Sequence, residues 1–430
     1  MLPWFWDVNG NPMSKCFSEV APMKKRRVLQ MNCVVLVFCA AMAIAAPAQV
    51  LTTLHSFDGS DGESLYAGLI QATDGNFYGT TGQGGAYYNG SVFKITPSGT
   101  LTTLYSFCSQ TNCVDGSGPL AGLVQASNGN FYGTTEFGGT SGNCSNGCGT
   151  IFRITPSGTL TVFHSFDNAD GATPFAGLMQ AADGNFYGTT YGGGVDGYGT
   201  VFKITPSGTL TTLHGFRGPD GNRPVAGLIQ ATDGNFYGTT LVGGAYGAFG
   251  YGTVFKLTPS GTLTTLYSFC TQPGCADGWN PHAGVIQATD GDFYGTTDGA
   301  GAYGDGTVFK ITPNGTLTTV HSFDGTDGAS SWAGLVQATD GNFYGTTSTG
   351  GTYNDYCRYG CGTVFKITPS GTLTTLHSFN YADGYMPLAG LVQATDGNFY
   401  GTTYGGGSYG AGAVFRLVLP HPCIVCRTAE

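Results

Sequence analysis

The sequence "ATDGNFYGTT" at Ala72–Thr81 decides the fold, because the chain carries close copies of it in seven places. A second motif, "LTTLHSF", alternates with it and begins near Leu51, Leu101, Leu160, Leu210, Leu263, Leu317 and Leu373. Successive starts are separated by 50 residues at the shortest, as from Leu51 to Leu101, and 59 at the longest, from Leu101 to Leu160. A period of about 40–50 residues with several strands per unit is typical of β-propeller blades.

Each repeat contains four short runs with strand character, which we name A to D. In the first repeat they are "AGLIQA" (67–72), "FYGTT" (77–81), "SVFKIT" (91–96) and "LTTLYSF" (101–107). Asp74-Gly75 between A and B favours the tight turn of an antiparallel hairpin. No stretch after residue 48 shows helical periodicity, so we predict an all-β chain with four antiparallel strands per blade.

The ends of the repeat array predict how the ring closes. The array begins with a lone D-type strand at 51–57 and ends with A (389–394), B (399–403) and C (412–417) but no D strand. A seven-bladed propeller results if strand 51–57 completes the last blade. Closure of this kind removes the open sheet edges that invite aggregation.

The unit "GLVQATDGNFYGTT…GG…GTVFKITPSGTLTTLHSF" resembles the GloVer tandem repeat of the "choice-of-anchor" exported bacterial proteins, over residues 51–418. The resemblance implies export, and often a C-terminal sorting or anchoring signal, but no assigned activity. This chain departs from the pattern in its last residues. "VLPHPCIVCRTAE" (418–430) has neither an apolar anchor nor a basic stop, so we expect release rather than surface attachment.

The first 48 residues read as an upstream extension followed by a secretory signal peptide. From Met23 the sequence shows a basic stretch, an apolar run and the small-residue site Ala46-Pro47-Ala48. We therefore expect translation from Met23, cleavage after Ala48, a propeller over 49–418 and a short tail over 419–430. The expected location is secreted, extracellular or periplasmic, with no membrane span in the mature chain.

The charge of the mature chain excludes two classes of partner. Residues 1–48 hold 5 of the 16 basic and 2 of the 26 acidic residues, which leaves 11 basic and 24 acidic residues and a net charge near −13. Nucleic acids and anionic membrane surfaces are poor partners for such a surface. We expect a monomer without a resident cofactor.

The repetition itself serves architecture rather than chemistry. A residue found in every blade belongs to the blade, as does the Lys or Arg of "VFKIT". The His of "LHSF" is replaced by Tyr105 and Tyr267 in two repeats, which packing tolerates and catalysis would not. Because strands alternate in direction, the B–C and D–A loops share one face of the ring. We call it the loop face, and since it carries the variation in length we expect function there.

Ten cysteines of the mature chain form five local pairs. Cys108/Cys113 and Cys270/Cys275 lie in D–A loops, Cys144/Cys148 and Cys357/Cys361 in B–C loops, and Cys423/Cys426 in the tail. Even numbers in an exported chain indicate disulfides, each closing a small ring that would contribute roughly 2 kcal/mol. Zinc is the alternative, since Cys108/Cys113 and Cys144/Cys148 could meet at the second blade.

Every D–A loop also contains Asp-Gly, at Asp61, Asp115, Asp170, Asp220, Asp277, Asp327 and Asp383. Calcium could use these oxygens, whereas an ordinary turn explains them equally simply. We favour the turn and keep calcium as the alternative for these residues.

Aromatic and basic residues of the loop face are the candidate ligand-binding residues. They are Trp279, His282, Trp332, Tyr356, Arg217 and Arg223. Tyr and Trp suit recognition because they offer large contact area at low entropic cost. The alternative is that these rings only cover Gly-rich loops, and both interpretations stay open.

Two functional hypotheses follow. The first is an exported, non-enzymatic propeller that binds or scaffolds through its loop face, with a polysaccharide, another cell-envelope component or an exported protein as partner. The second is a secreted hydrolase or lyase acting on polysaccharide, which predicts one asymmetric cluster of acids with a His or Arg near the axis. Arg217, Arg223 and His282 are its only hints in the sequence.

Overall fold

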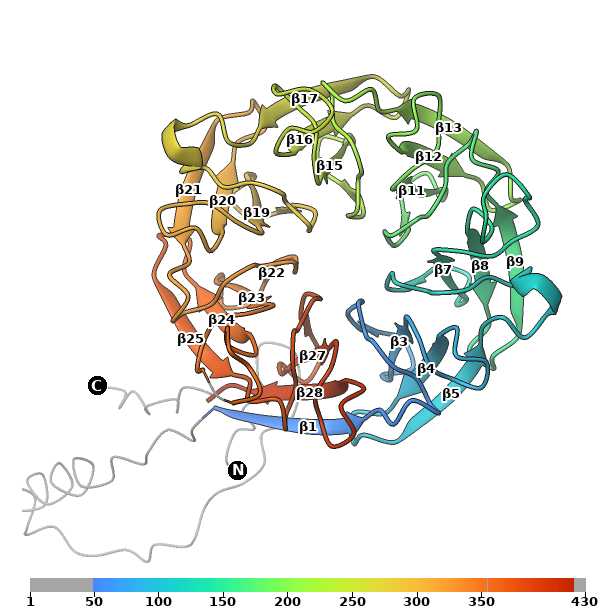
Figure 1. The fold of residues 1–430 in the computed structure, drawn as a ribbon, viewed down its shortest axis with the longest axis horizontal. Coiled ribbons are helices and arrows are strands. Elements are labelled where there is room, and N and C mark those ends of the chain that lie inside the picture. Colours follow the sequence, from blue (N-terminus) through green and yellow to red (C-terminus); the bar gives the residue numbers. More distant parts are fainter. Residues whose placement is uncertain (1–48, 354, 421–430) are drawn as a thin grey trace, which may run out of the picture. The chain divides into compact units, whose positions relative to one another are not determined.

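The computed structural model describes residues 49–353 and 355–420, and within them Gln49–Leu419 form one compact unit. This unit consists of seven antiparallel four-stranded sheets arranged in a ring (Figure 1). Its only helical segments among the described residues are two single 3-10 turns, at Thr111–Cys113 and Pro273–Cys275. The prediction of an all-β, seven-bladed propeller is therefore confirmed.

The strands run outward from the axis in the order A to D, and we number the blades by their B strands. The A strands are β2 (Ile70–Gln71), β6 (Val124–Gln125), β10 (Met179–Gln180), β14 (Ile229–Gln230), β18 (Ile286–Gln287), β22 (Val336–Gln337) and β26 (Val392–Gln393). The B strands are β3 (Phe77–Thr81), β7 (Phe131–Thr135), β11 (Phe186–Thr190), β15 (Phe236–Thr240), β19 (Phe293–Thr297), β23 (Phe343–Thr347) and β27 (Phe399–Thr403). The C strands are β4 (Ser91–Ile95), β8 (Thr150–Ile154), β12 (Thr200–Ile204), β16 (Thr253–Leu257), β20 (Thr307–Ile311), β24 (Thr363–Ile367) and β28 (Ala413–Val418). The D strands are β5 (Leu101–Ser106), β9 (Leu160–Ser165), β13 (Leu210–Gly215), β17 (Leu263–Ser268), β21 (Leu317–Ser322), β25 (Leu373–Ser378) and β1 (Val50–Ser56).

The B strands begin and end where the sequence places them, but the A strands are shorter than expected. In the first blade only Ile70 and Gln71 pair with strand B, although the sequence suggests residues 67–72. The residues before them leave the sheet because the blades converge at the axis. A Cβ on Gly68 would lie 2.9 Å from the carbonyl oxygen of Gly390 in the neighbouring blade. Backbone contact between blades replaces strand pairing there.

The first strand of the described chain pairs with the last. β1 lies antiparallel to β28, with Leu51 opposite Leu417 and Ser56 opposite Ala413. The seventh blade is thus assembled from both ends of the array (Figure 1).

The residues of the repeated motifs make the contacts between blades. The Tyr of each "FYGTT" stacks on the Phe of the next, with ring centroids 4.1–4.3 Å apart around the whole ring. The first Thr donates to the carbonyl of the Ala in "AGL" of the next blade, as Thr80 does to Ala121 at 2.8 Å. The same bond joins Thr402 in blade seven to Ala67 in blade one, also at 2.8 Å. The closing interface therefore uses the same chemistry as the other six.

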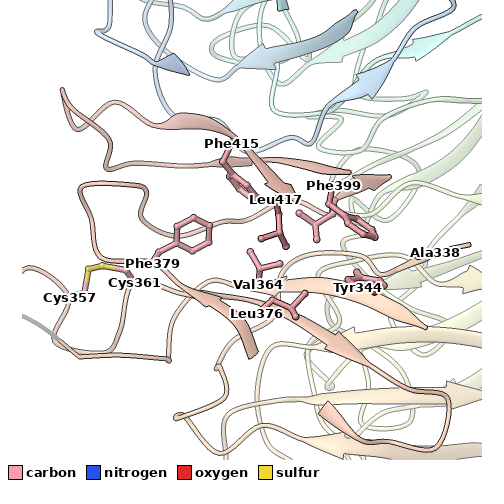
Figure 2. Close-up of a cluster of buried hydrophobic side chains, with 11 residues drawn as sticks. Ala338, Tyr344, Cys357, Cys361, Val364, Leu376, Phe379, Phe399, Phe415 and Leu417 are labelled. Atoms are coloured by element: carbon pink, nitrogen blue, oxygen red, sulfur yellow. A yellow bond between two sulfur atoms is a disulfide. The ribbon is translucent and has the colours of Figure 1, made fainter. Parts of the chain in front are cut away.

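The apolar core is divided into seven clusters, each filling the space between two neighbouring blades. Figure 2 shows the cluster between blades six and seven, where Tyr344, Val364 and Leu376 face Phe399 and Phe415. The Gly of "FYGTT" is required here. A Cβ at Gly401 would lie 2.5 Å from the Phe415 ring, so the ring occupies the space that a side chain would take.

Candidate binding site at the propeller axis

One pocket lies at the axis of the ring, and every blade contributes the same repeat position to it. This position immediately precedes Ala-Gly at the end of the D–A loop, and we call it the inner ring: Tyr66, Leu120, Phe175, Val225, His282, Trp332 and Leu388. Tyr191 and Leu241 complete the lining, and the pocket volume is about 250 Å³. The seven blades place six residue types at this one repeat position. The pocket wall is therefore asymmetric, although the backbone around it is nearly symmetric.

A strained turn holds each inner-ring residue in place. The residue two positions earlier has a φ between 49° and 64° in all seven blades: Ser64, Gly118, Thr173, Arg223, Asn280, Ser330 and Met386. This left-handed conformation costs a residue with a side chain about 1–2 kcal/mol. Backbone hydrogen bonds on both sides hold it; Arg223, for example, donates its N–H to Tyr198 and accepts from the N–H of Leu241. Because the conformation recurs in all seven blades, it is part of the repeat and fixes where each inner-ring residue lies.

A second variable position adjoins the inner ring, and two of its residues, Tyr191 and Leu241, line the pocket. It follows "FYGTT" directly, and we call it the outer ring: Gly82, Glu136, Tyr191, Leu241, Asp298, Ser348 and Tyr404. The N–H of each outer-ring residue donates to the carbonyl of the left-handed residue of its own blade, as Asp298 does to Asn280. The two rings are therefore joined by backbone bonds and form one rigid rim.

The most polar part of the rim joins both rings between blades five and six. The indole N–H of Trp332 donates to Oδ1 of Asp298 at 2.9 Å. The His282 ring stacks flat on the Trp332 ring, with centroids 4.0 Å apart and an angle of 6° between the planes. Nε2 of His282 lies 3.9 Å from Oδ2 of Asp298. An aromatic plane, a carboxylate and an imidazole thus meet at one side of the pocket.

The opposite part of the rim is aromatic. Tyr66 packs edge-on against Tyr404 with centroids 5.0 Å apart, and Phe175 packs against Tyr191 at 5.1 Å. The guanidinium of Arg223 lies over the Tyr191 ring, 5.1 Å from its centroid, in a cation–π contact. Aromatic side chains with a few polar groups are typical of the lining of small-molecule sites.

Burial shifts the titration of three groups at the rim. It raises the pKa of the Glu136 carboxyl to about 7. It also raises the pKa of Tyr66 to about 12, with a further contribution from the hydrogen bond to Tyr404. Burial lowers the pKa of His282, and the nearby Asp298 carboxylate only partly opposes this effect. Near neutral pH the imidazole is uncharged and Glu136 is partly protonated, so both groups can donate and accept hydrogen bonds.

Three of the six candidate binding residues belong to this rim. His282 and Trp332 line the pocket, and Arg223 holds the strained turn and covers Tyr191. The other three lie elsewhere on the loop face. Trp279 stacks on Tyr251 with centroids 5.7 Å apart and lies over Gly299, where a Cβ would touch the indole nitrogen.

Tyr356 and Arg217 belong to the exposed loops. Tyr356 is 78% exposed and stacks on Tyr381, with centroids 5.6 Å apart. The Arg217 side chain is 74% exposed, and its Nε lies 3.8 Å from an Asp196 carboxylate oxygen. Neither residue lines the axial pocket.

Exposed apolar residues stand at the B–C loops of six blades. Those more than half exposed are Tyr88, Val195, Tyr246, Phe249, Tyr303, Tyr353, Tyr356, Tyr359 and Tyr409. Blade two has none, because its B–C loop carries the Cys144/Cys148 pair among Ser, Asn and Gly residues. The loop face thus carries strongly exposed apolar side chains at the B–C loop of every blade except blade two.

The four cysteine pairs within the described residues are disulfides: Cys108–Cys113, Cys144–Cys148, Cys270–Cys275 and Cys357–Cys361. The disulfide prediction is confirmed for these pairs, and the zinc alternative is wrong for the two at blade two. Cys423 and Cys426 lie outside the described residues. Disulfides persist in oxidising compartments, which is where these four place the chain.

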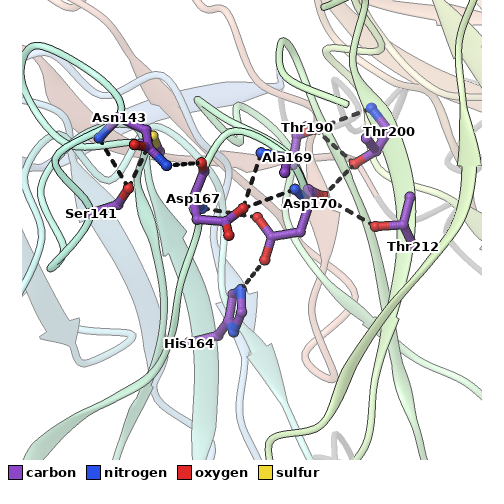
Figure 3. Close-up of polar contacts among 10 residues, drawn as sticks. Ser141, Asn143, His164, Asp167, Ala169, Asp170, Thr190, Thr200 and Thr212 are labelled. Atoms are coloured by element: carbon purple, nitrogen blue, oxygen red, sulfur yellow. Dashed lines mark hydrogen bonds and ion pairs between the residues drawn. The ribbon is translucent and has the colours of Figure 1, made fainter. Parts of the chain in front are cut away.

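The Asp-Gly carboxylates are hydrogen-bonded within their own turns. In Figure 3, Nε2 of His164 lies 2.7 Å from Oδ2 of Asp170, whose other oxygen accepts the N–H of Asp167. The same His–Asp pair recurs in five blades. In the other two, Tyr105 and Tyr267 donate to Asp115 and Asp277 instead. This explains why the repeat accepts either residue, and both serve the turn.

Residues 49–353 and 355–420 contain no helix long and apolar enough to cross a membrane. They also contain no group of three or more His, Cys, Asp or Glu side chains placed to hold a metal ion.

Sequence reasoning based on residue type missed most of the rim, although a signal was present. The position before Ala-Gly and the position after "FYGTT" change in almost every repeat, between flanks that hardly change. Comparing the seven repeats column by column would have selected Glu136, Tyr191 and Asp298 together with the inner ring. Selecting Trp and His by type found only two members of the inner ring.

Comparison with known proteins covers the whole propeller. The family model described as the Gloeobacter/Verrucomicrobia repeat matches residues 40–182, 140–357 and 247–422. No curated protein matches the chain.

Several solved structures are similar to this chain at low identity. A protein of unknown function from Dyadobacter fermentans is 10% identical with a TM-score of 0.45, over 86% of this chain and 98% of that one. A luciferin-regenerating enzyme is 10% identical with a TM-score of 0.41, over 86% and 96%. A glucose dehydrogenase is 13% identical with a TM-score of 0.36, over 56% and 80%. These similarities concern the fold and carry no information about this chain's ligand or chemistry.

Proposed function

Since this chain belongs to the Gloeobacter/Verrucomicrobia repeat family, whose model spans the whole propeller, we propose that it is an exported binding protein whose ligand site is the axial pocket. The observation that carries the proposal is the distribution of variation among the repeats. Positions that join blades are nearly identical in all seven, whereas the inner ring, which lines one pocket, and the outer ring, which adjoins it, vary from blade to blade. A purely structural propeller has no need for this asymmetry.

The chemistry of the rim favours a glycan as the ligand. Sugar rings offer an apolar face that packs on Trp and Tyr, and hydroxyl groups that bond to carboxylates, imidazoles and phenols. Trp332 with Asp298 and His282 supplies both kinds of contact within one side of the pocket. A volume of about 250 Å³ is below that of typical drug-sized sites, so a single sugar residue of a longer chain is the expected occupant.

The test is a glycan array probed with the full chain, expressed for export and purified with its disulfides intact. We expect selective binding that Trp332→Ala weakens about tenfold or more, because the stacking plane is lost. Trp279→Ala is the matched control, since this Trp lies outside the pocket, and it should leave binding unchanged. A parallel array with EDTA tests the calcium sites, and we expect no effect.

Two outcomes would replace the proposal. Absence of binding to every glycan would direct the search to exported protein partners.

The second candidate function, a polysaccharide hydrolase or lyase, is favoured by one observation: the Glu136 carboxyl has its pKa raised to about 7, which suits a general acid or base near neutral pH. Release of reducing ends or unsaturated products from polysaccharides, abolished by Glu136→Gln, would establish an enzyme instead.

A further inference from the structure

A second hollow lies on the loop face at blade two, away from the axis. It is a groove of about 950 Å³ between the D–A loop that contains Cys108–Cys113 and the B–C loop that contains Cys144–Cys148. Cys113 and Cys144 both line it. The other two disulfides of the described chain lie in loops of different blades, five and six. Blade two is therefore the place where two disulfide loops face each other.

Both walls of the groove are rigid. The D–A loop is fixed by the fully buried Asp115, which accepts bonds from the Tyr105 hydroxyl at 2.8 Å and the Ser109 N–H at 2.9 Å. Gly139 in the B–C loop donates its N–H to the carbonyl of Cys113 at 3.0 Å, which ties the two loops together at the base.

The outer end of the B–C loop is braced from the other side. Nδ2 of Asn143 donates to the carbonyl of Asp167 in the next D–A loop at 2.9 Å, as Figure 3 shows. The Asn143 N–H donates to the Ser141 hydroxyl at 3.2 Å, which keeps the loop tip folded on itself. The groove is thus held open without help from a ligand.

The lining of the groove is uncharged and combines polar with apolar groups. None of its residues, all within the described part of the chain, is Asp, Glu, Lys, Arg or His. Four exposed polar side chains of the lining make no hydrogen bond to another described residue: Asn112, Thr140, Ser145 and Asn146. Phe137 supplies a half-buried aromatic side chain in the lining. Amides and hydroxyls that both donate and accept suit a partner of the same kind.

We propose that this groove is a second binding site and that it takes an uncharged oligosaccharide. An anionic or cationic ligand would find no counter-charge here, and an apolar one would find a lining with only one aromatic side chain. A groove of this size accommodates several sugar residues, whereas the axial pocket holds one. The proposal uses none of the axial residues, so it stands or fails independently of the axial site.

The experiment measures affinity for uncharged hexasaccharides by titration calorimetry, with cellohexaose, laminarihexaose, maltohexaose and chitohexaose as probes. The groove variant is Asn112→Gly with Asn146→Ala. Glycine is chosen because Asn112 has a φ of 58°, and Gly274 holds the equivalent place, with a φ of 68°, in the disulfide loop of blade five. Gly274→Asn is the matched control, because that loop faces no second disulfide loop.

We expect at least one hexasaccharide to bind, about tenfold more weakly to the groove variant because two amide contacts are lost. Gly274→Asn should leave this affinity unchanged. Cys144→Ser with Cys148→Ser, which frees one wall, should weaken binding as well, whereas Cys357→Ser with Cys361→Ser should not. No binding by any hexasaccharide, or equal affinity in the groove variant and the wild type, would overturn the proposal.

Discussion

Among single residues, Glu136 differs most from its counterparts in the other blades. The same outer-ring position holds Gly82 in blade one and Leu241 in blade four, so the frame accepts no side chain, an apolar one or a carboxyl there. A carboxyl placed at this depth keeps its proton more tightly than it would in water, because burial disfavours the charged form. The residue at this position therefore decides whether blade two contributes a titratable carboxyl to the rim.

This shift predicts how stability depends on pH. The pKa of Glu136 is about 7 in the folded chain and near 4.5 without burial, so the folded state binds the proton more tightly. The contribution is fully present below about pH 4.5 and is lost as the pH rises through 7. Between pH 5 and pH 8 we expect the wild type to lose about 1–3 kcal/mol of unfolding free energy relative to Glu136→Gln.

Urea unfolding of both proteins at the two pH values measures this difference directly. Glu63→Gln is the control, since Glu63 is exposed and lies in the preceding blade. A pH dependence shared equally by the wild type and Glu136→Gln would show that Glu136 ionises normally.

Among the elements, strand B shows what the repetition contributes. Its Tyr, Gly and first Thr each contact a neighbouring blade or the Phe of strand C, so almost every letter has a partner. Because the seven copies of strand B have the same sequence, the seven interfaces between neighbouring blades have the same contacts.

The interfaces should be equal in energy as well. Thr402→Val removes the bond to Ala67 at the closing interface, and Thr239→Val removes the 2.9 Å bond to Ala283 at an internal one. Both carbonyls are left without this buried partner, so each variant should lose about 1–3 kcal/mol, and by the same amount. Urea unfolding checks this. A loss at Thr239 several times that at Thr402 would mean that blades seven and one are less tightly joined than their neighbours.

Strand B also shows how far the sequence predicts the structure. Alternation, turn residues and the period predict the B, C and D strands to within one or two residues, because local pairing forms them. The A strands end early because seven backbones meet at Gly68 and its equivalents, which is a property of the ring and not of any repeat. The rim is hidden for the same reason. Tyr66 and Tyr404 lie at opposite ends of the repeat array, and only closure brings their rings into contact.

At the scale of the whole molecule, the ring depends on β1. Its residues pair along the full length of β28, and Leu54 and Phe57 pack in the core between blades seven and one. Without β1 the seventh blade would expose an open edge strand, the kind of surface that associates with other chains.

Removing residues 49–57 should therefore abolish cooperative thermal unfolding and produce aggregates in size-exclusion chromatography. A circular permutant with these residues placed after Leu419 through a short Gly/Ser linker should restore a monomer whose melting temperature lies within about 5 °C of the wild type, because the same strand pairs with β28. A permutant that stays aggregated, or a deletion that melts normally, would show that β1 does not close the ring.

The pairing of β1 with β28 also has a consequence for the order of events during synthesis. The ribosome makes β1 first, yet its partner appears only with residues 413–418, so every incomplete product is an arc with two unsatisfied borders. Such an arc offers chaperones and proteases a surface that the finished ring has lost. The ring therefore closes only after translation has reached the last blade. A truncated chain keeps the open borders on which chaperones and proteases act.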